Sequence, residues 1–207
     1  MKTVDWYFDF LSPYSYLQGE RLHELDALAQ VNPIPVLFAG LLKHWGTKGP
    51  AELTTKRRFT MEHIAWLAFR RKAAIRCPSP FPFNPLPLLR LSNVLGNSRR
   101  AVLTIFRWVW QGGHSPVDAA AFAELLRELG VAAERSEDPA IKERVRADTD
   151  AAIARGVFGV PTGIVDGRLF WGDDATDMLI AYLRGDPFFE SESFLAAEKL
   201  SPGVERR

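Results

Sequence analysis

Strand-like sequence lies only at the two ends of this 207-residue chain. Residues 4–10 and 34–38 near the start, and residues 157–172 near the end, are apolar stretches rich in aromatic or β-branched side chains. We expect the strands from both ends of the chain to assemble into one mixed sheet. Helices packed around such a sheet make an α/β fold. Helical patterns occupy the stretch between, at residues 51–75, 102–109, 118–129 and 138–154.

The first strand leads directly into a helix. Ser12 is a candidate N-cap, and Pro13 stands at the first helical position, where its missing N–H is no loss. We expect this amphipathic helix to end near Gln30. The junction presents unpaired backbone N–H groups and the positive end of a helix dipole beside Ser12, which favours an anion. A plain serine cap explains the same residues, so a site here needs support from elsewhere in the chain.

Ser12 and Ser15 have the spacing of the redox Cys-x-x-Cys motif, with a serine at each cysteine position. A hydroxyl cannot form a disulfide. Cys77 is the single cysteine, so an intramolecular disulfide is excluded. Because Cys77 lies outside the motif, a thiol–disulfide oxidoreductase is not expected. The electrostatics that lower the pKa of a redox cysteine would instead act on a thiol supplied from outside.

The charge balance, the spacing of the histidines and the lack of long apolar runs argue against several classes of function. Lysine and arginine total 26 against 25 aspartate and glutamate, without a long run of one sign, so a nucleic-acid partner is not expected. The four histidines lack paired metal-ligand spacing, so we expect no metal site. The chain opens directly into a strand, without a signal-like apolar core or a long apolar run. We therefore expect a soluble cytoplasmic protein without membrane contact.

The second strand, residues 34–38, contains Pro35, which suggests an edge or strand-end position. A strand–helix–strand unit normally joins parallel strands. Residues 41–50 carry glycine, lysine and tryptophan and predict a loop. In the helix predicted over 51–75, an apolar face is expected from Phe59, Ile64, Trp66, Leu67 and Phe69.

A proline-rich stretch follows that helix. Residues 77–87 hold five prolines, which end the helix, but their phenylalanines and leucines are unlike a solvated linker. We expect an ordered surface loop with Asn84 and Arg90 available to a ligand; a purely structural turn is an equal alternative.

The end of the chain carries a strong hairpin signal. Asp166-Gly167 stands between two apolar runs, as in a two-residue β-hairpin. A helix is expected over 173–183, and its acidic first turn suits the helix dipole. Residues after Pro187 are expected to pack loosely or to form a subunit contact.

Three segments together resemble a known family: residues 8–17, 156–162 and 170–174. They are similar to 2-hydroxychromene-2-carboxylate isomerases, which are close to kappa-class glutathione transferases. Both belong to the DsbA-like branch of the thioredoxin superfamily, in which a helical domain interrupts the thioredoxin fold. The resemblance runs in order through essentially the whole chain and is specific at its two ends.

The resemblance implies a division into domains. Residues 1–42 and 155–207 would form a discontinuous thioredoxin-like domain, and residues 43–154 a helical insertion domain. It also implies a homodimer.

Matching positions imply a glutathione site. Ser12 would hydrogen-bond the glutathione thiolate in place of the redox cysteine. Val160-Pro161 would be a cis-proline element, in which the Val160 backbone pairs with the cysteinyl backbone of glutathione. The γ-glutamyl end would lie against Trp171, Gly172, Asp173 and Asp174.

Among these last residues, Asp174 is our choice of carboxylate partner for the α-ammonium group. Helix capping is the alternative role for both aspartates. In the insertion, Lys43, Asn84 and Arg90 would hold the carboxylate of an aromatic substrate. The chain departs from the isomerase pattern at residues 51–53, where family members provide polar substrate contacts, so the resemblance leaves the exact substrate open.

The function implied is a glutathione-dependent cis–trans isomerisation of 2-hydroxychromene-2-carboxylate or a related aromatic enone carboxylate, with glutathione as cofactor. Two alternatives stay open. One is a kappa-like glutathione transferase, which would use the same site and release a conjugate. The other is a non-catalytic glutathione- or peptide-binding protein.

Overall fold

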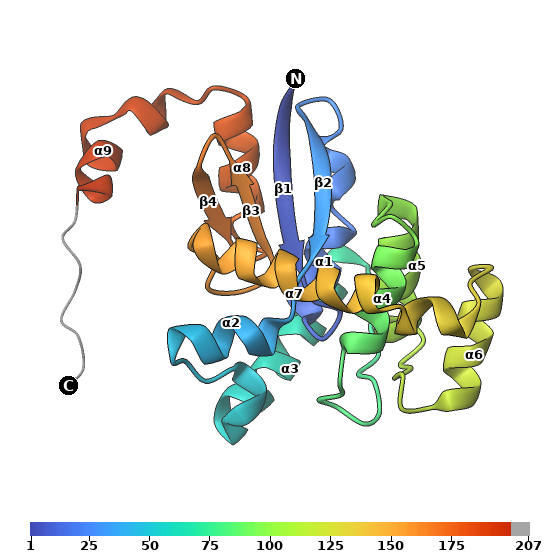
Figure 1. The fold of residues 1–207 in the computed structure, drawn as a ribbon. Coiled ribbons are helices and arrows are strands. Elements are labelled where there is room, and N and C mark those ends of the chain that lie inside the picture. The colour runs from blue at the N-terminus through green and yellow to red at the C-terminus, as the bar shows by residue number, and fades with distance from the viewer. Residues whose placement is uncertain (200–207) are drawn as a thin grey trace.

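A four-stranded sheet forms the centre of the computed structural model, which describes residues 1–199 (Figure 1). The strand order is β2-β1-β3-β4. β1 pairs parallel with β2 and antiparallel with β3, and β3 pairs antiparallel with β4. Both ends of the chain therefore supply the sheet, as the sequence predicts. The strands are β1 (Lys2–Phe8), β2 (Ala29–Pro35), β3 (Thr162–Val165) and β4 (Arg168–Trp171).

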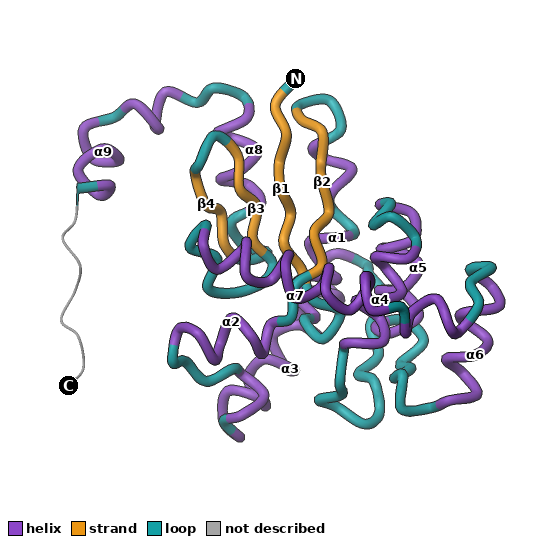
Figure 2. Tube along the Cα trace, in the orientation of Figure 1, coloured by secondary structure: helices purple, strands orange, loops and turns teal. Residues whose placement is uncertain are grey.

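Helices make up most of the remaining described chain (Figure 2), and six α-helices lie between β2 and β3. The α-helices are α1 (Pro13–Gly19), α2 (Phe38–Trp45), α3 (Thr54–Arg71), α4 (Leu86–Val94), α5 (Arg99–Trp110), α6 (Ala119–Glu128), α7 (Pro139–Ala154), α8 (Thr176–Leu183) and α9 (Glu192–Glu198). Short 3-10 helices are η1 (Leu22–Leu25), η2 (Pro50–Glu52), η3 (Ala133–Glu137) and η4 (Pro187–Glu190). The predicted helical insertion is confirmed. The expected domain boundary at residue 42 falls inside α2, and the division at that residue stays a prediction.

The side chains of β1 alternate between two cores. Trp6 and Phe8 stack with ring centroids 4.7 Å apart and pack against Phe106 of α5 on one face. Tyr7 points to the other face and shares a smaller core with Ala152 of α7. In Figure 1, α7 crosses one side of the sheet while α1 and α8 lie on the other. The sheet is therefore buried on both faces.

The path between β1 and β2 differs from the prediction. The helix expected to reach Gln30 ends at Gly19, and β2 begins at Ala29 instead of residue 34. Asn32 and Pro33 lie inside β2. A proline is tolerated there because β2 is an edge strand, with one side free of ladder hydrogen bonds. The predicted edge position of this strand is confirmed.

The loop predicted for residues 41–50 is wrong in its first half, since α2 occupies residues 38–45. Gly40, just before the predicted loop, lies inside α2. A Cβ built at Gly40 would lie 3.1 Å from the Thr149 methyl of α7, so glycine allows these two helices a close approach. Gly46 then ends α2 at a φ of 62°, which glycine adopts without strain.

The predicted apolar face of α3 is partly wrong. Ile64 is buried, but the side chains of Phe59, Trp66 and Phe69 are 64%, 54% and 80% exposed. The face that α3 turns to the core is made instead by small and short residues, including Thr60 and Ala68. The apolar pattern alone could not separate these two faces.

The proline-rich stretch after α3 contains no helix or strand before α4, and Phe83 is buried in the larger core. It is thus an ordered loop, as expected. The hairpin between β3 and β4 is also confirmed, since Asp166 and Gly167 both have positive φ.

Loose packing after Pro187 is wrong for the described residues. Phe189 is buried, with ring centroids 5.1 Å from Tyr182 and 5.0 Å from Phe194. The part of this prediction that concerns residues 200–207 lies outside the described residues. No helix among residues 1–199 is long and apolar enough to cross a membrane.

Candidate functional site

Ser12 caps α1 and lies beside Val160. Its Oγ accepts a hydrogen bond from the Ser15 N–H at 3.1 Å. Its hydroxyl donates to the Val160 carbonyl at 3.5 Å, far longer than the usual O–H···O distance of about 2.8 Å. The cap is therefore well formed. The hydrogen bond from the Ser12 hydroxyl to Val160 is weak, so this O–H group can donate to a better acceptor instead. Because α1 has only seven residues, this local geometry carries more weight than the helix dipole.

The Val160–Pro161 peptide bond is cis, as predicted. Val160 is buried, and its N–H finds no hydrogen-bond partner among residues 1–199. The Thr162 hydroxyl fixes the loop by donating to the Gly159 carbonyl at 2.7 Å. Beside Ser12, the Val160 backbone thus offers one free donor and one weakly bonded acceptor.

The segment from Trp171 to Asp174 is tied to both of these elements. The Gly172 N–H donates to the Pro161 carbonyl at 2.9 Å. The Gln18 amide of α1 donates to the Gly172 carbonyl at 2.9 Å and accepts from the Trp6 indole at 2.7 Å. The structure therefore brings together Ser12, the cis-proline and this segment. Gln18 was not predicted from the sequence, because a glutamine on a short helix carries no signal of burial.

The two neighbouring aspartates differ sharply. Asp173 is 2% exposed and accepts two hydrogen bonds from Arg71 at the end of α3, at 2.8 and 2.6 Å. Asp174 is exposed. Arg71 was also missed, since a cation in the last turn of a helix usually needs no partner beyond the helix dipole.

Trp171 lies over the loop before the cis-proline. It is 53% exposed, and its ring meets Phe158 edge to face at 4.9 Å. A Cβ built at Gly159 would lie 2.6 Å from the Trp171 Nε1, so this close approach requires glycine. The indole therefore borders the loop before the cis-proline, and about half of Trp171 is open to solvent.

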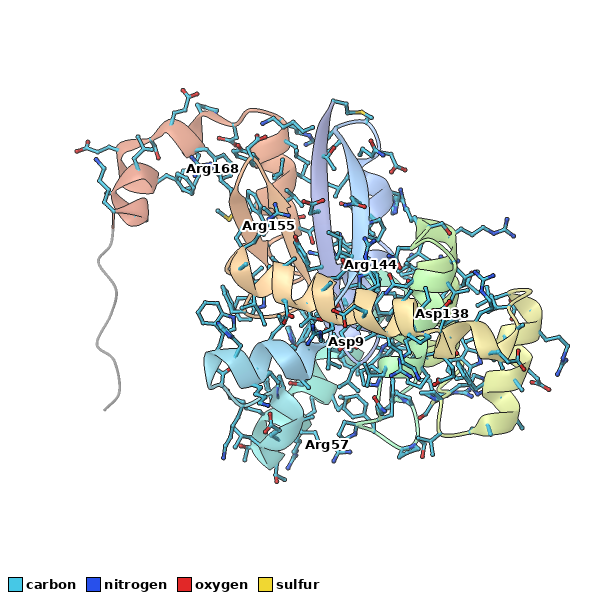
Figure 3. The ribbon with its side chains drawn as sticks, in the orientation of Figure 1. Asp9, Arg57, Asp138, Arg144, Arg155 and Arg168 are labelled. Atoms are coloured by element: carbon cyan, nitrogen blue, oxygen red, sulfur yellow. The ribbon has the colours of Figure 1, made fainter. Side chains whose placement is uncertain are left out.

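Asp9 is a fully buried carboxyl three residues before Ser12. It accepts hydrogen bonds from the backbone N–H groups of Leu11 and Phe38, both at 2.9 Å. Burial raises the pKa of Asp9 to about 7, while these two hydrogen bonds lower it. Figure 3 shows Asp9 at the lower end of the sheet, between α7 and α2. Asp9 was not predicted as a site residue, although its position at the end of an aromatic strand is a signal of burial in the sequence.

The three residues expected to hold a substrate carboxylate come from three different segments: α2, the loop before α4, and α4 itself. Lys43 is exposed on α2. Asn84 accepts a hydrogen bond from the Leu86 N–H at 3.1 Å, which suits the structural-turn alternative. Arg90 forms an ion pair with Glu137 at 3.3 Å. Within residues 1–199 no hydrogen bond or ion pair joins any of them to Ser12, and their role stays a prediction.

Comparison with known proteins places the chain in a family. Residues 3–184 match the DSBA-like thioredoxin domain. The chain belongs to this family. Its thioredoxin-like fold with inserted helices, expected from the sequence, is therefore confirmed.

Named relatives cover nearly the whole chain. A 2-hydroxychromene-2-carboxylate isomerase of Pseudomonas sp. (strain C18) is 30% identical over 193 residues, 89% of this chain and 91% of the relative. Human glutathione S-transferase kappa 1 is 24% identical over 208 residues, 89% of this chain and 92% of the relative. A solved structure of 2-hydroxychromene-2-carboxylate isomerase superposes with a TM-score of 0.78 at 26% identity, covering 96% of this chain and all of that one. The resemblance inferred from the sequence is thus confirmed.

Proposed function

We propose that this protein is a glutathione-dependent cis–trans isomerase that acts on 2-hydroxychromene-2-carboxylate or a related aromatic enone carboxylate. The observation that carries the proposal is the Ser12 hydroxyl, weakly bonded to Val160 beside a cis-proline, in a motif without cysteine. The isomerase named among the relatives supports the reaction, and the kappa transferase supports glutathione.

The groups at the site fit the parts of glutathione. The Ser12 hydroxyl suits a thiolate, because a hydrogen bond to a charged acceptor is stronger than its present 3.5 Å contact. The free N–H and the carbonyl of Val160 suit a peptide backbone, as in strand addition. The exposed carboxylate of Asp174 suits an α-ammonium group. Trp171 and Gly172 shape the surface next to it.

Glutathione, when bound, would supply a thiolate that adds reversibly to a conjugated double bond and lets the resulting single bond rotate. Each residue of the site then has one role. Ser12 turns its hydroxyl from the Val160 carbonyl toward the sulfur and stabilises the charged form. Val160 and Pro161 fix the backbone of the tripeptide. Lys43, with Asn84 and Arg90, would bind the carboxylate of the aromatic substrate.

A kappa-like glutathione transferase is the second candidate, favoured by the human relative and by the same serine site. A non-catalytic glutathione- or peptide-binding protein is a third. We propose in each case a homodimer in the cytoplasm, with a small-molecule partner.

One experiment separates the three. The protein is incubated with 2-hydroxychromene-2-carboxylate and a panel of aryl enones, with and without glutathione, while absorbance and free thiol are followed. Glutathione-dependent spectral change without loss of thiol supports the isomerase. Stoichiometric loss of thiol supports the transferase, and tight glutathione binding without turnover supports the binding protein.

A further inference from the structure

Tyr14 and His63 form a hydrogen-bonded pair beside the site. Tyr14 lies two residues after Ser12 in α1, and His63 lies on α3. The Tyr14 hydroxyl and the His63 Nδ1 are 2.9 Å apart, and both residues are partly buried. Neither residue has a task in the glutathione site described above.

The imidazole ring is held between two aromatic side chains. Phe59 and Trp66 lie four residues before and three residues after His63, on the same face of α3. Their rings are nearly parallel to the imidazole, at 16° in both cases, with centroids 5.7 and 6.1 Å away. The stack fixes the plane of His63 and so the direction of its Nδ1 toward Tyr14.

Tyr14 also lies within electrostatic reach of the glutamyl end of the proposed glutathione site. The pKa of Tyr14 is raised overall: burial raises it most, the charges of Asp173 and Asp174 raise it further, and a hydrogen bond with the Thr60 side chain lowers it. A phenol whose pKa is raised stays protonated at neutral pH. Tyr14 is therefore a hydrogen-bond donor next to Ser12.

We propose that Tyr14 donates a hydrogen bond to the carbonyl oxygen of the electrophilic substrate and that His63 is the positioning residue that aims it. When the His63 Nδ1–H donates to the Tyr14 oxygen, the phenolic O–H is free to point outward. This inference rests on the proposed function and adds a residue that acts on the electrophile and not on the thiol.

The charge that Tyr14 would stabilise appears during thiol addition. The C–S bond forms as the π pair of the C=C bond moves through the conjugated system onto the carbonyl oxygen. Both changes reverse when the sulfur leaves, so the step consumes no proton, oxidant or reductant. A donor already in place at that oxygen lowers the barrier because no solvent has to reorganise.

The first test uses no glutathione. 4-Nitrophenolate carries a charged oxygen on a planar ring, and 4-nitroanisole offers a similar ring without charge. The wild-type protein is expected to bind the phenolate about tenfold more tightly than the anisole, and Tyr14→Phe to bind both equally. His63→Phe keeps the ring stack but lacks the donor to Tyr14, so it should lose part of the preference for the phenolate. His63→Gln has an amide donor and should keep more of this preference than His63→Phe. A Tyr14→Phe protein with the wild-type preference, or a wild-type protein with none, overturns the inference.

Turnover of an aryl enone with glutathione gives the second test. Tyr14→Phe should lower kcat about ten- to a hundredfold, while the KM for glutathione changes by less than about twofold. The double variant Tyr14→Phe/His63→Phe should be no slower than Tyr14→Phe alone, because His63 acts through Tyr14. An unchanged kcat in Tyr14→Phe overturns this inference and leaves the role of Ser12 intact. Absence of glutathione binding by calorimetry would remove the proposed function instead, and the nitrophenolate comparison still decides the inference.

Discussion

Arg71 donates two hydrogen bonds to Asp173, at 2.8 and 2.6 Å, and so joins the end of α3 to the segment that precedes α8. The Asp173 carboxylate is buried and its charge is already paired. Its neighbour Asp174 is exposed and has no ion-pair partner among residues 1–199. Two adjacent aspartates thus occupy a buried, paired position and an exposed position.

Substitution should therefore separate stability from binding. Asp173→Asn removes half of an ion pair that is buried on the aspartate side and partly exposed on the arginine side. We expect a loss of about 2–3 kcal/mol in the free energy of unfolding, somewhat less than for a fully buried pair. Asp174→Asn should change stability by less than about 0.5 kcal/mol. It should weaken glutathione binding about tenfold by removing the partner of the ammonium group.

Urea denaturation measures the change in stability of each variant, and calorimetry with glutathione measures the change in affinity. Each variant is the control for the other, because both change one carboxylate to an amide at adjacent positions. Equal loss of glutathione affinity in both, with unchanged stability, would contradict this division of roles.

Local signals made much of the site predictable. A serine cap, an Asp-Gly hairpin and the Val160-Pro161 pair each depend on a few adjacent residues. These elements meet because β1 pairs directly with β3, which brings Ser12 and Val160 together across 148 positions. Strand signals at both ends of the chain were enough to expect that both ends share one sheet, but not which strands pair.

Long-range polar partners were not predictable in the same way. Arg71 lies 102 positions before Asp173, and nothing near Arg71 in the sequence identifies its partner. The exposed aromatic residues of α3 show the same limit, since their apolar character predicted burial that the tertiary structure does not provide. In β2, Asn32 and Pro33 end helices in most contexts, but an edge strand accommodates them.

Ser12→Ala should slow turnover more than it weakens glutathione binding. A hydrogen bond to a charged group contributes about 1.5–3 kcal/mol, and each 1.4 kcal/mol in the barrier is about tenfold in rate. We expect a loss of about ten- to a hundredfold at neutral pH, shrinking at high pH where the thiolate forms unaided. The measurement is a pH–rate profile with saturating glutathione.

Ser15→Ala is the matched control for that variant. The Ser15 side chain is fully buried, and its Oγ has no hydrogen-bond partner among residues 1–199, so its loss should leave the rate nearly unchanged. The backbone N–H that caps onto Ser12 remains in this variant. Equal rates for wild type and Ser12→Ala across the neutral range would mean that Ser12 is only a helix cap.

Asp9 should make stability depend on pH in a defined direction. Its pKa is raised from 3.8 to about 7 in the folded protein, so the folded state binds the proton more tightly than the unfolded chain. The stabilisation from this proton is complete below about pH 4, falls as the pH rises and is lost above about pH 7. The full change amounts to at most about 4 kcal/mol, at about 1.4 kcal/mol for each unit of pKa.

Asp9→Asn isolates this contribution, because an amide does not titrate. The free energy of unfolding is measured for both proteins from pH 4 to pH 8, and the difference between them is compared. Wild type should lose stability relative to Asp9→Asn across that interval. A constant difference would mean that the buried carboxyl does not take up a proton on folding.

Gln18 should contribute more to stability than an ordinary glutamine on a helix. Its side chain accepts from the Trp6 indole at 2.7 Å and donates to the Gly172 carbonyl and the Thr176 hydroxyl, at 2.9 and 3.0 Å. Gln18→Met has a similar volume but leaves the indole N–H and the Gly172 carbonyl without these partners. Unsatisfied buried groups cost about 1–3 kcal/mol each, so we expect a loss of about 2–4 kcal/mol in the free energy of unfolding.

Gln111→Met is the matched control, since Gln111 is partly buried and its side chain makes one hydrogen bond within residues 1–199, to the Tyr16 hydroxyl at 3.0 Å. That variant should lose only about 0.5–1.5 kcal/mol. Because Gln18 holds the segment that carries Asp174, Gln18→Met should also weaken glutathione binding, whereas Gln111→Met should not. Chemical denaturation and calorimetry on the two variants measure both effects. Similar losses of stability in the two would show that the contacts of Gln18 are replaced by water, and that the hydrogen bonds of Gly172 to Pro161 and of Asp173 to Arg71 are enough to hold the segment.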